Sequence, residues 1–325
     1  MINNITLDEK IEMISYEEAI EFAKKEVEGA LVKSPRLIRE YLTHLASSQG
    51  KYIRAVSVIV AAQDKDGKVH PDAIKAAGAI EIIHLASLVH DDIIDNADIR
   101  RGKPTLQKKY GKRTAVICGD YLLSLALKMM LASRDKKRYI ELDLPEYINK
   151  LCLGELEQHV NNYNLNLSIY QYLKIISGKT AALFEASFFA GAVVLAASEA
   201  EIAKYKQIGY YIGMIFQLTD DCIDFDTAIE VANKPVQSDY EQGVITLPLI
   251  HAFQEMSNFK EKAENTGITR DEINEAVKKT GGLDFTKGLV TRYYKKAMKR
   301  IEDLELTDDK RAKIMYILNK ASRVQ

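Results

Sequence analysis

Two acidic motifs of the same spacing contain the residues best suited to chemistry. Each follows an apolar run, and together they comprise Asp91, Asp92 and Asp95, and Asp220, Asp221 and Asp224. On a helix, the first and last carboxylates of such a motif lie one above the other, with the second beside them. These like charges repel unless cations bind between them. The first motif offers oxygen ligands with no Cys nearby, which favours a hard ion, and Mg²⁺ is the first candidate.

The repetition of the motif favours a metal site over a solvated acidic face, which is the usual meaning of a single copy. If the two helices face each other, the six carboxylates converge on one cavity. Several divalent ions bridged by an anionic ligand would make that arrangement tolerable. Diphosphate is an anion of this kind.

Basic residues that match such an anion stand at predicted helix starts and in a loop. Lys51 and Arg54 follow Gly50 at a predicted helix start, where cations oppose the helix dipole. A bound anion would explain them, and a solvated helix N-terminus is an equally good explanation. Arg100 and Arg101 follow the first acidic motif. Three interpretations are open for this pair: a basic loop, intramolecular ion pairs with the motif, or a second phosphate site. Arg suits the last, because its guanidinium can donate two parallel hydrogen bonds to a phosphate.

Two further sites resemble known motifs only in part. Ser177-Gly178-Lys179-Thr180 is not a P-loop, because Leu173 stands where that motif needs Gly and no strand precedes it. Lys179 remains a candidate diphosphate contact. Glu81 and His84 have the spacing of a di-iron helix, but such sites need a second copy and there is none. His84 is a core residue or points into the cavity of Asp91, seven residues later.

Composition excludes several classes of protein. The chain has 325 residues, 47% hydrophobic and 28% charged, with a net charge of −1 that gives no case for binding nucleic acid. Three Cys without a CxxC favour a reducing compartment. No signal peptide is evident, and the longest apolar stretch, Ala186 to Ala197, is too short to span a bilayer. We therefore expect a cytoplasmic protein without a transmembrane segment.

Long 3.6-residue periodicity predicts an all-α fold, a single large helical bundle around a central cavity formed by one domain over residues 1–325. Pro104 is expected to open a helix, 120–131 to be a buried apolar helix, and 227–242 to be a functional loop. A helix near residue 246 and three more should end the chain. The other predicted helices cover about 8–30, 36–47, 52–64, 71–95, 143–163, 168–176, 179–198 and 200–224.

Taken together, these motifs resemble the trans-isoprenyl diphosphate synthases, the polyprenyl synthetase family. The resemblance spans residues 50 to 248 in the family's order, ending in Gly243-x-x-Thr246-Leu247-Pro248. Two positions depart from the family pattern: Ala55, where Pro is usual, and Asn233, where Gly is usual.

The resemblance implies an isoprenoid synthase-like fold and a Mg²⁺-dependent, head-to-tail condensation of isopentenyl diphosphate with an allylic diphosphate. It implies a homodimer and three Mg²⁺ ions, with Mn²⁺ as a substitute. The metal ligands would be Asp91, Asp95 and Asp220, and the catalytic residues Asp91, Asp92, Asp95, Lys179, Asp220 and Asp221. Isopentenyl diphosphate would contact Gly50, Lys51, Arg54, His84 and Arg101. The allylic diphosphate would contact Arg100, Lys179, Thr180, Gln217 and Lys234.

Product length is expected to depend on the side chains one turn before Asp91, which are Ala86 and Ser87. Both are small, which leaves volume for a product beyond geranylgeranyl diphosphate, of about six to eight isoprene units. The residue that limits this volume from the opposite side is Met129, Met130 or Tyr121, and the sequence does not decide between them.

Other functions remain as alternatives. A shorter-chain farnesyl or geranylgeranyl diphosphate synthase has the same motifs. A class I terpene cyclase would lack the second acidic motif and the Lys51–Arg54 pair. A non-catalytic partner subunit of a heteromeric prenyl synthase would be expected to have lost ligands, and an acidic helical scaffold would not explain the matched cations.

Overall fold

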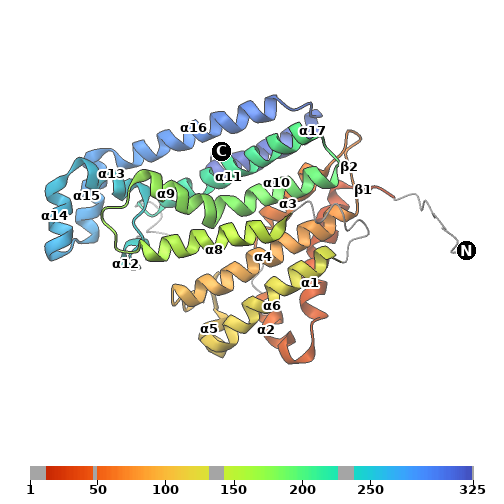
Figure 1. Ribbon diagram of the computed structural model, residues 1–325, viewed down its shortest axis with the longest axis horizontal. Helices are drawn as coiled ribbons and strands as arrows, with labels where there is room; N and C mark the ends of the chain where they lie inside the picture. Colours follow the sequence, from red (N-terminus) through yellow and green to blue (C-terminus); the bar gives the residue numbers. More distant parts are fainter. Residues whose placement is uncertain (1–11, 47–49, 132–142, 226–237, 324–325) are drawn as a thin grey trace, which may run out of the picture.

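Helices form nearly all of the structure, a computed structural model that describes residues 12–46, 50–131, 143–225 and 238–323 (Figure 1). The helices of the first half are α1 (Tyr16–Val32), α2 (Arg36–Ala46), α3 (Ile53–Ala62), α4 (Asp72–Ile94), α5 (Leu106–Tyr110), α6 (Lys112–Leu131) and α8 (Leu144–Val160). The later ones are α9 (Ile169–Ile176), the π-helix η1 (Ser177–Ala181), α10 (Ala182–Val194), α11 (Glu199–Ile223), α12 (Ser238–Glu241), α13 (Leu247–Glu255), α14 (Ser257–Thr266), α15 (Arg270–Thr280), α16 (Gly282–Glu302) and α17 (Asp308–Ser322). The all-α prediction is confirmed.

Two short antiparallel ribbons accompany the helices. One pairs β1 (Ile14–Ser15) with β2 (Lys68–Val69), and the other pairs β3 (Ile99–Arg100) with β4 (Lys103–Pro104). The prediction that Pro104 opens a helix is wrong, because the side chain of Thr105 accepts a hydrogen bond from the N–H of Lys108 and caps α5 instead. The β3–β4 hairpin brings Arg100 back beside the first acidic motif.

Local capping explains other differences from the predicted boundaries. Within the described residues the first helix begins at Tyr16, where Ser15 and Glu18 form a capping box, and the start predicted near residue 8 lies outside the described residues. The helix predicted over 179–198 is divided into η1 and α10, which ends at Val194. Four helices follow α13 rather than three.

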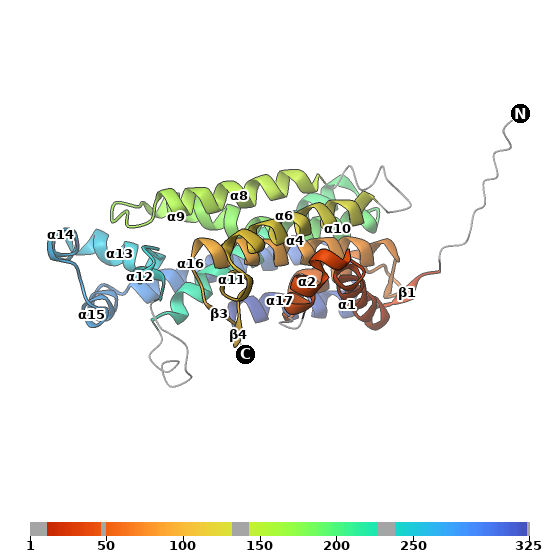
Figure 2. The same cartoon turned by 90° about the horizontal axis from the view of Figure 1, so that it is seen from below.

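The arrangement of α4 and α11 places both acidic motifs at the same end of the bundle (Figure 1). Both helices run in the same direction along the long axis, and each motif stands at a helix C-terminus. Seen from below, α8 runs along one face of the bundle and the β3–β4 hairpin projects at the other (Figure 2). Residues of α1, α3, α4, α6 and α10 form the largest buried hydrophobic cluster.

Two of these helices, α4 and α6, are long and apolar enough to cross a membrane, contrary to the expectation that no stretch is long enough. The most apolar stretch is 56% buried inside the molecule in α4, as expected of a core helix, but only 39% buried in α6. The prediction of a buried helix over 120–131 is only partly correct. Leu122 and Ala126 are buried, but Leu131 is 63% exposed.

Candidate active site

The first acidic motif ends α4. The backbone N–H of Asp95 donates to the carbonyl of Asp91 at 2.8 Å, so their side chains leave the last turn of the helix. Burial raises the pKa of Asp91 to about 7, and the charges of Glu155 and Asp95 add to this effect while Lys179 opposes it. Ionisation of Asp91 is therefore disfavoured in this partly desolvated place beside other carboxylates. A cation bound here would favour the ionised form.

Asp92 has a different environment from its neighbour. Its side chain is only 5% exposed, and the Nε of Arg100 donates to its Oδ1 at 2.6 Å. Burial raises the pKa of Asp92, while the Arg100 charge opposes this shift. The structure thus shows Arg100 in an intramolecular ion pair, one of the arrangements that the sequence left open.

The second motif is divided in the same way. Asp220 is exposed and pairs with Arg323, whose Nη2 lies 3.1 Å from its Oδ1. Asp221 is buried and accepts hydrogen bonds from Gln217, at 2.8 Å, and from the hydroxyl of Tyr172. Asp92 in the first motif and both Asp220 and Asp221 in the second therefore have partners within the protein. Among the described residues no three carboxylates come close enough to share a metal ion, so the expected convergence of six in one cavity is absent there.

Lys179 lies on η1, a π-helical turn of a kind often found at functional sites. Its Nζ donates to Glu155 of α8 at 3.0 Å. The neighbouring Thr180 hydroxyl donates to Gln217 at 2.7 Å and so connects η1 to α11 and, through Gln217, to Asp221. Glu155 was not predicted. The available signal was Gly154, because glycine in a helix interior is unfavourable without a packing reason.

A pocket opens where these elements meet. Ile94, Asp95, Glu155 and Lys179 line one part of it, and the other lining residues are Gln158, His159, Asn162, Gln242 and Val244. Asp95 and Lys179, both predicted site residues, therefore share one cavity with Glu155. Lys234 lies outside the described residues.

Basic residues lie near His84, which precedes Asp91 by seven residues, or about two helical turns. The pKa of His84 lies well below its usual value because burial, followed by the charges of Arg54, Arg101 and Arg100, disfavours protonation. Burial also lowers the pKa of Arg54 to about 10, with partial compensation from Glu81. The charges of three guanidinium groups thus act on the His84 imidazole, and such an accumulation of positive charge suits an anion.

Gly50 and Arg54 fit that interpretation. A Cβ on Gly50 would lie 2.9 Å from Nη1 of Arg101, so the chain before α3 and the β3–β4 hairpin approach closely there. The guanidinium of Arg54 lies over the ring of Phe184, 4.6 Å from its centroid, and within the described residues its buried Nε has no hydrogen-bond partner. Lys51 is exposed beside them.

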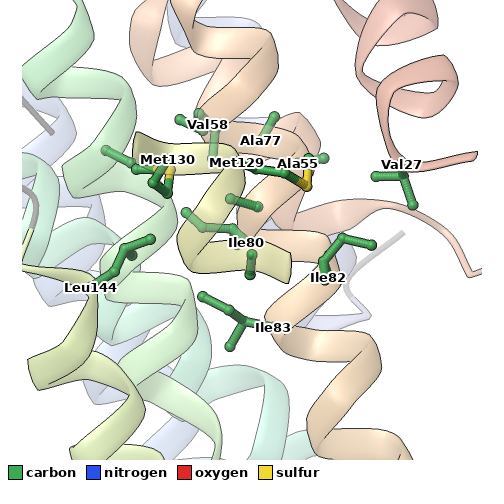
Figure 3. Close-up of a cluster of buried hydrophobic side chains, with 14 of the residues drawn as sticks. Val27, Ala55, Val58, Ala77, Ile80, Ile82, Ile83, Met129, Met130 and Leu144 are labelled. Atoms are coloured by element: carbon green, nitrogen blue, oxygen red, sulfur yellow. The ribbon is translucent and has the colours of Figure 1, made fainter. Parts of the chain in front are cut away.

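Apolar side chains fill the space along α4 behind the acidic motif (Figure 3). Ala86 is fully buried, and Ser87 donates its hydroxyl to the carbonyl of His84 at 2.9 Å. Met129 of α6 reaches α4 at Gly78, where an added Cβ would lie 2.9 Å from its Cε. The hydroxyl of Tyr121 donates to that of Ser34 at 3.2 Å, whereas Met129 approaches the backbone of α4.

The carboxylate oxygens of the acidic motifs are ligands of the type that suits a hard divalent cation. In the part of the chain that the structure describes, no three His, Cys, Asp or Glu side chains come together closely enough to hold a metal ion alone. Asp91, Asp95 and Asp220 supply oxygen atoms and no sulfur, as Mg²⁺ prefers. The burial and neighbouring carboxylates that raise the pKa of Asp91 support the fit, because a bound cation would favour its ionised form, and oxygen atoms of a bound diphosphate would complete the coordination.

Comparisons with known proteins agree with this arrangement. The sequence profile described as polyprenyl synthetase matches residues 35–303. The chain is 34% identical over 289 residues to "Heptaprenyl diphosphate synthase component 2" of Bacillus subtilis (strain 168), covering 88% of this chain and 82% of that protein. It is 30% identical over 285 residues to an octaprenyl diphosphate synthase of Haemophilus influenzae, covering 86% of both. The crystal structure of heptaprenyl diphosphate synthase from Staphylococcus aureus matches with a TM-score of 0.86 at 34% identity, covering 96% of this chain and 99% of that one.

Proposed function

The chain belongs to the polyprenyl synthetase family, and from that membership we propose that it is a trans-polyprenyl diphosphate synthase with a medium- or long-chain product. Its substrates are isopentenyl diphosphate and an allylic diphosphate, and its reaction is a prenyl transfer. The observation that carries the proposal is the division of charge at one end of the bundle. Carboxylates and Lys179 line one pocket, and the charges of Arg54, Arg101 and Arg100 lower the pKa of His84.

The difficult step of such a reaction is the separation of an allylic carbocation from diphosphate. Asp91, Asp95 and Asp220 would hold Mg²⁺, which supplies electrostatic stabilisation of the leaving group. We propose three ions, with Mn²⁺ as a substitute. Lys179 binds the departing diphosphate from η1, with Arg100 and Lys234 as further contacts. Thr180 and Gln217 fix the position of η1 against α11.

Isopentenyl diphosphate must not ionise, and the arginine cluster can hold it without a metal. Lys51, Arg54 and Arg101 neutralise its charge, and neutral His84 donates or accepts one hydrogen bond. The Nε of buried Arg54 is one donor that such an anion would satisfy. The diphosphate product serves as the base for the final proton, so no dedicated base is needed.

Product length depends on the apolar region behind the acidic motif. The growing chain passes Ala86 and Ser87 and displaces flexible side chains such as Met129, since methionine adapts readily to a changed shape. The names of the two long-chain relatives support a product beyond geranylgeranyl diphosphate.

We propose a single domain and a cytoplasmic homodimer. Exposed apolar residues on α6 and α8 support the dimer, because such patches commonly mark interfaces. They are Val116, Ile117, Leu131, Leu153, Leu156 and Val160. The word "component" in the Bacillus subtilis name makes a different partner chain the second candidate. Sedimentation of the purified chain at micromolar concentration should give a dimer, and a monomer would favour that second candidate.

Substrate-specific kinetics tests the two anion sites. Lys51→Ala or Arg54→Ala should mainly raise the KM for isopentenyl diphosphate, whereas Lys179→Ala should mainly affect the allylic substrate and turnover. Loss of each charge-assisted contact should correspond to roughly 1.5–3 kcal/mol. If all three variants shift the KM of the same substrate, the division into two sites is wrong.

A further inference from the structure

Two glycines bring α8 and η1 into backbone contact. A Cβ on Gly154 would lie 2.3 Å from the backbone nitrogen of Lys179, and one on Gly178 would lie 2.7 Å from the carbonyl oxygen of Lys150. Neither position accepts a larger residue without separation of the two elements. This contact places Glu155 and Lys179, each next to one of the glycines, opposite one another at the edge of the pocket.

Lys179 therefore stands between two groups of carboxylates. Its Nζ is 3.0 Å from Glu155, whose side chain is only 12% exposed, and within the described residues this is the one carboxylate in an ion pair with it. Burial lowers the pKa of Lys179, but Glu155, Asp91 and Asp95 outweigh that effect and raise it. The Lys179 ammonium thus interacts electrostatically with Asp91 and Asp95 on α4 and is hydrogen-bonded to Glu155 on α8.

We propose that Glu155 is a positioning residue that holds Lys179 away from Asp91 and Asp95. Those carboxylates then remain available to a divalent cation, and the ammonium remains available to diphosphate. The inference rests on the proposed function, in which Asp91 and Asp95 are metal ligands. Without Glu155, the half-buried ammonium would turn to Asp91 and Asp95, because a desolvated charge without a partner is costly. Lys179 would then compete with the cation.

Binding of Mn²⁺ in the presence of inorganic diphosphate, followed by electron paramagnetic resonance, tests this without turnover. Glu155→Gln should weaken Mn²⁺ binding roughly 10- to 100-fold, the range for residues that support metal ligands. In steady-state assays the KM for the allylic substrate should rise and that for isopentenyl diphosphate should not. Glu155→Asp, which keeps the charge, should recover part of the affinity.

Glu157 provides a matched control. It lies on the same helix and pairs with Lys174, whose side chain is 60% exposed, outside the pocket. Glu157→Gln should leave Mn²⁺ affinity unchanged. Equal losses in Glu155→Gln and Glu157→Gln would contradict the proposal, because they would indicate a general effect of charge on α8.

A double-mutant cycle with Lys179→Gln decides between positioning and direct ligation. If Glu155 acts through Lys179, then Glu155→Gln has no further effect on Mn²⁺ binding in the Lys179→Gln background. If it weakens binding as much there as in the wild-type background, Glu155 is itself a ligand and the proposal is overturned. An unchanged affinity in the single variant would also overturn it. Unchanged Mn²⁺ binding in Asp91→Ala would instead refute the metal assignment.

Discussion

Neighbouring carboxylates of each acidic motif have different environments. Asp220 is exposed and pairs with Arg323, whereas Asp221 is buried and hydrogen-bonded to Gln217. Likewise, Asp92 is held by Arg100, while Asp91 faces Glu155 and Lys179. Asp91 and Asp220, the outer carboxylates, can therefore exchange their present partners for a metal ion. Asp92 and Asp221, the inner ones, hold the ends of the helices in place.

Substitution of the outer carboxylates tests this division. Asp91→Ala or Asp220→Ala should lower turnover roughly 10²- to 10³-fold or more, because the leaving group loses electrostatic stabilisation. The thermal unfolding temperature should not fall, since repulsion is relieved. Asp98→Ala, which removes an exposed partner of Lys108, is the control and should retain wild-type turnover. Near-normal turnover of both motif variants would refute the site.

At the scale of elements, α4 carries the acidic motif, the product-length positions and the contact with α6. Gly78 precedes Ala86 by two turns, a rise of about 12 Å. Met129 fills the surface left by Gly78, and Figure 3 shows it within a cluster that includes Ala77, Ile80 and Ile83. The growing chain therefore has small side chains on α4 and flexible ones opposite.

Product analysis of three substitutions tests this element. Ala86→Phe or Ser87→Phe should shorten the product sharply, because the ring fills the volume of the next isoprene unit. Met129→Ala should give products of equal or greater length. Chromatography of the dephosphorylated products measures both effects. An unchanged product distribution in the Phe variants would contradict the proposed path along α4.

The attachment of α17 gives a stability prediction at the same scale. Nζ of buried Lys310 donates to the carbonyls of Ala61, at 2.8 Å, and Gln63, at 2.6 Å, at the end of α3. Burial lowers the pKa of Lys310 to about 7, partly offset by Glu201 and Asp64. A neutral amine still has the two N–H donors that these carbonyls need.

Unfolding in urea at several pH values tests this contact. Between about pH 7 and pH 10 the unfolded chain binds a proton that the folded protein lacks, so wild-type stability should rise with pH. Lys310→Met should abolish that increase and cost roughly 1–3 kcal/mol, because two buried carbonyls lose their donor. Lys320→Met, at an exposed position of α17, should keep the wild-type slope. An unchanged slope in Lys310→Met would show that Lys310 stays protonated.

At the scale of the whole molecule, segments far apart in the chain complete the site. The last described turn brings Arg323 to Asp220, and the β3–β4 hairpin brings Arg100 to Asp92. Helical periodicity and the acidic spacing were sufficient to predict the all-α class, most of the helices and both motifs, but not the η1 turn or the number of helices after α13. The Arg323–Asp220 pair was not predictable, because periodicity carries no information about which distant side chains meet, whereas the proximity of Arg100 to the first motif already made an ion pair one of its possible arrangements. The position of Glu155 depends on the close contact of Gly154 and Gly178, which only the packing reveals.

The most direct test of the central claim is an assay of the purified protein with labelled isopentenyl diphosphate, an allylic primer and Mg²⁺. Farnesyl and geranylgeranyl diphosphate are the primers to compare. We expect Mg²⁺-dependent, chelator-sensitive incorporation into linear products longer than geranylgeranyl diphosphate. A cyclic hydrocarbon formed without isopentenyl diphosphate would indicate a terpene cyclase, and a product that stops at farnesyl diphosphate would contradict the long-chain assignment. No incorporation with either primer would contradict the claim that this chain alone is a prenyl diphosphate synthase.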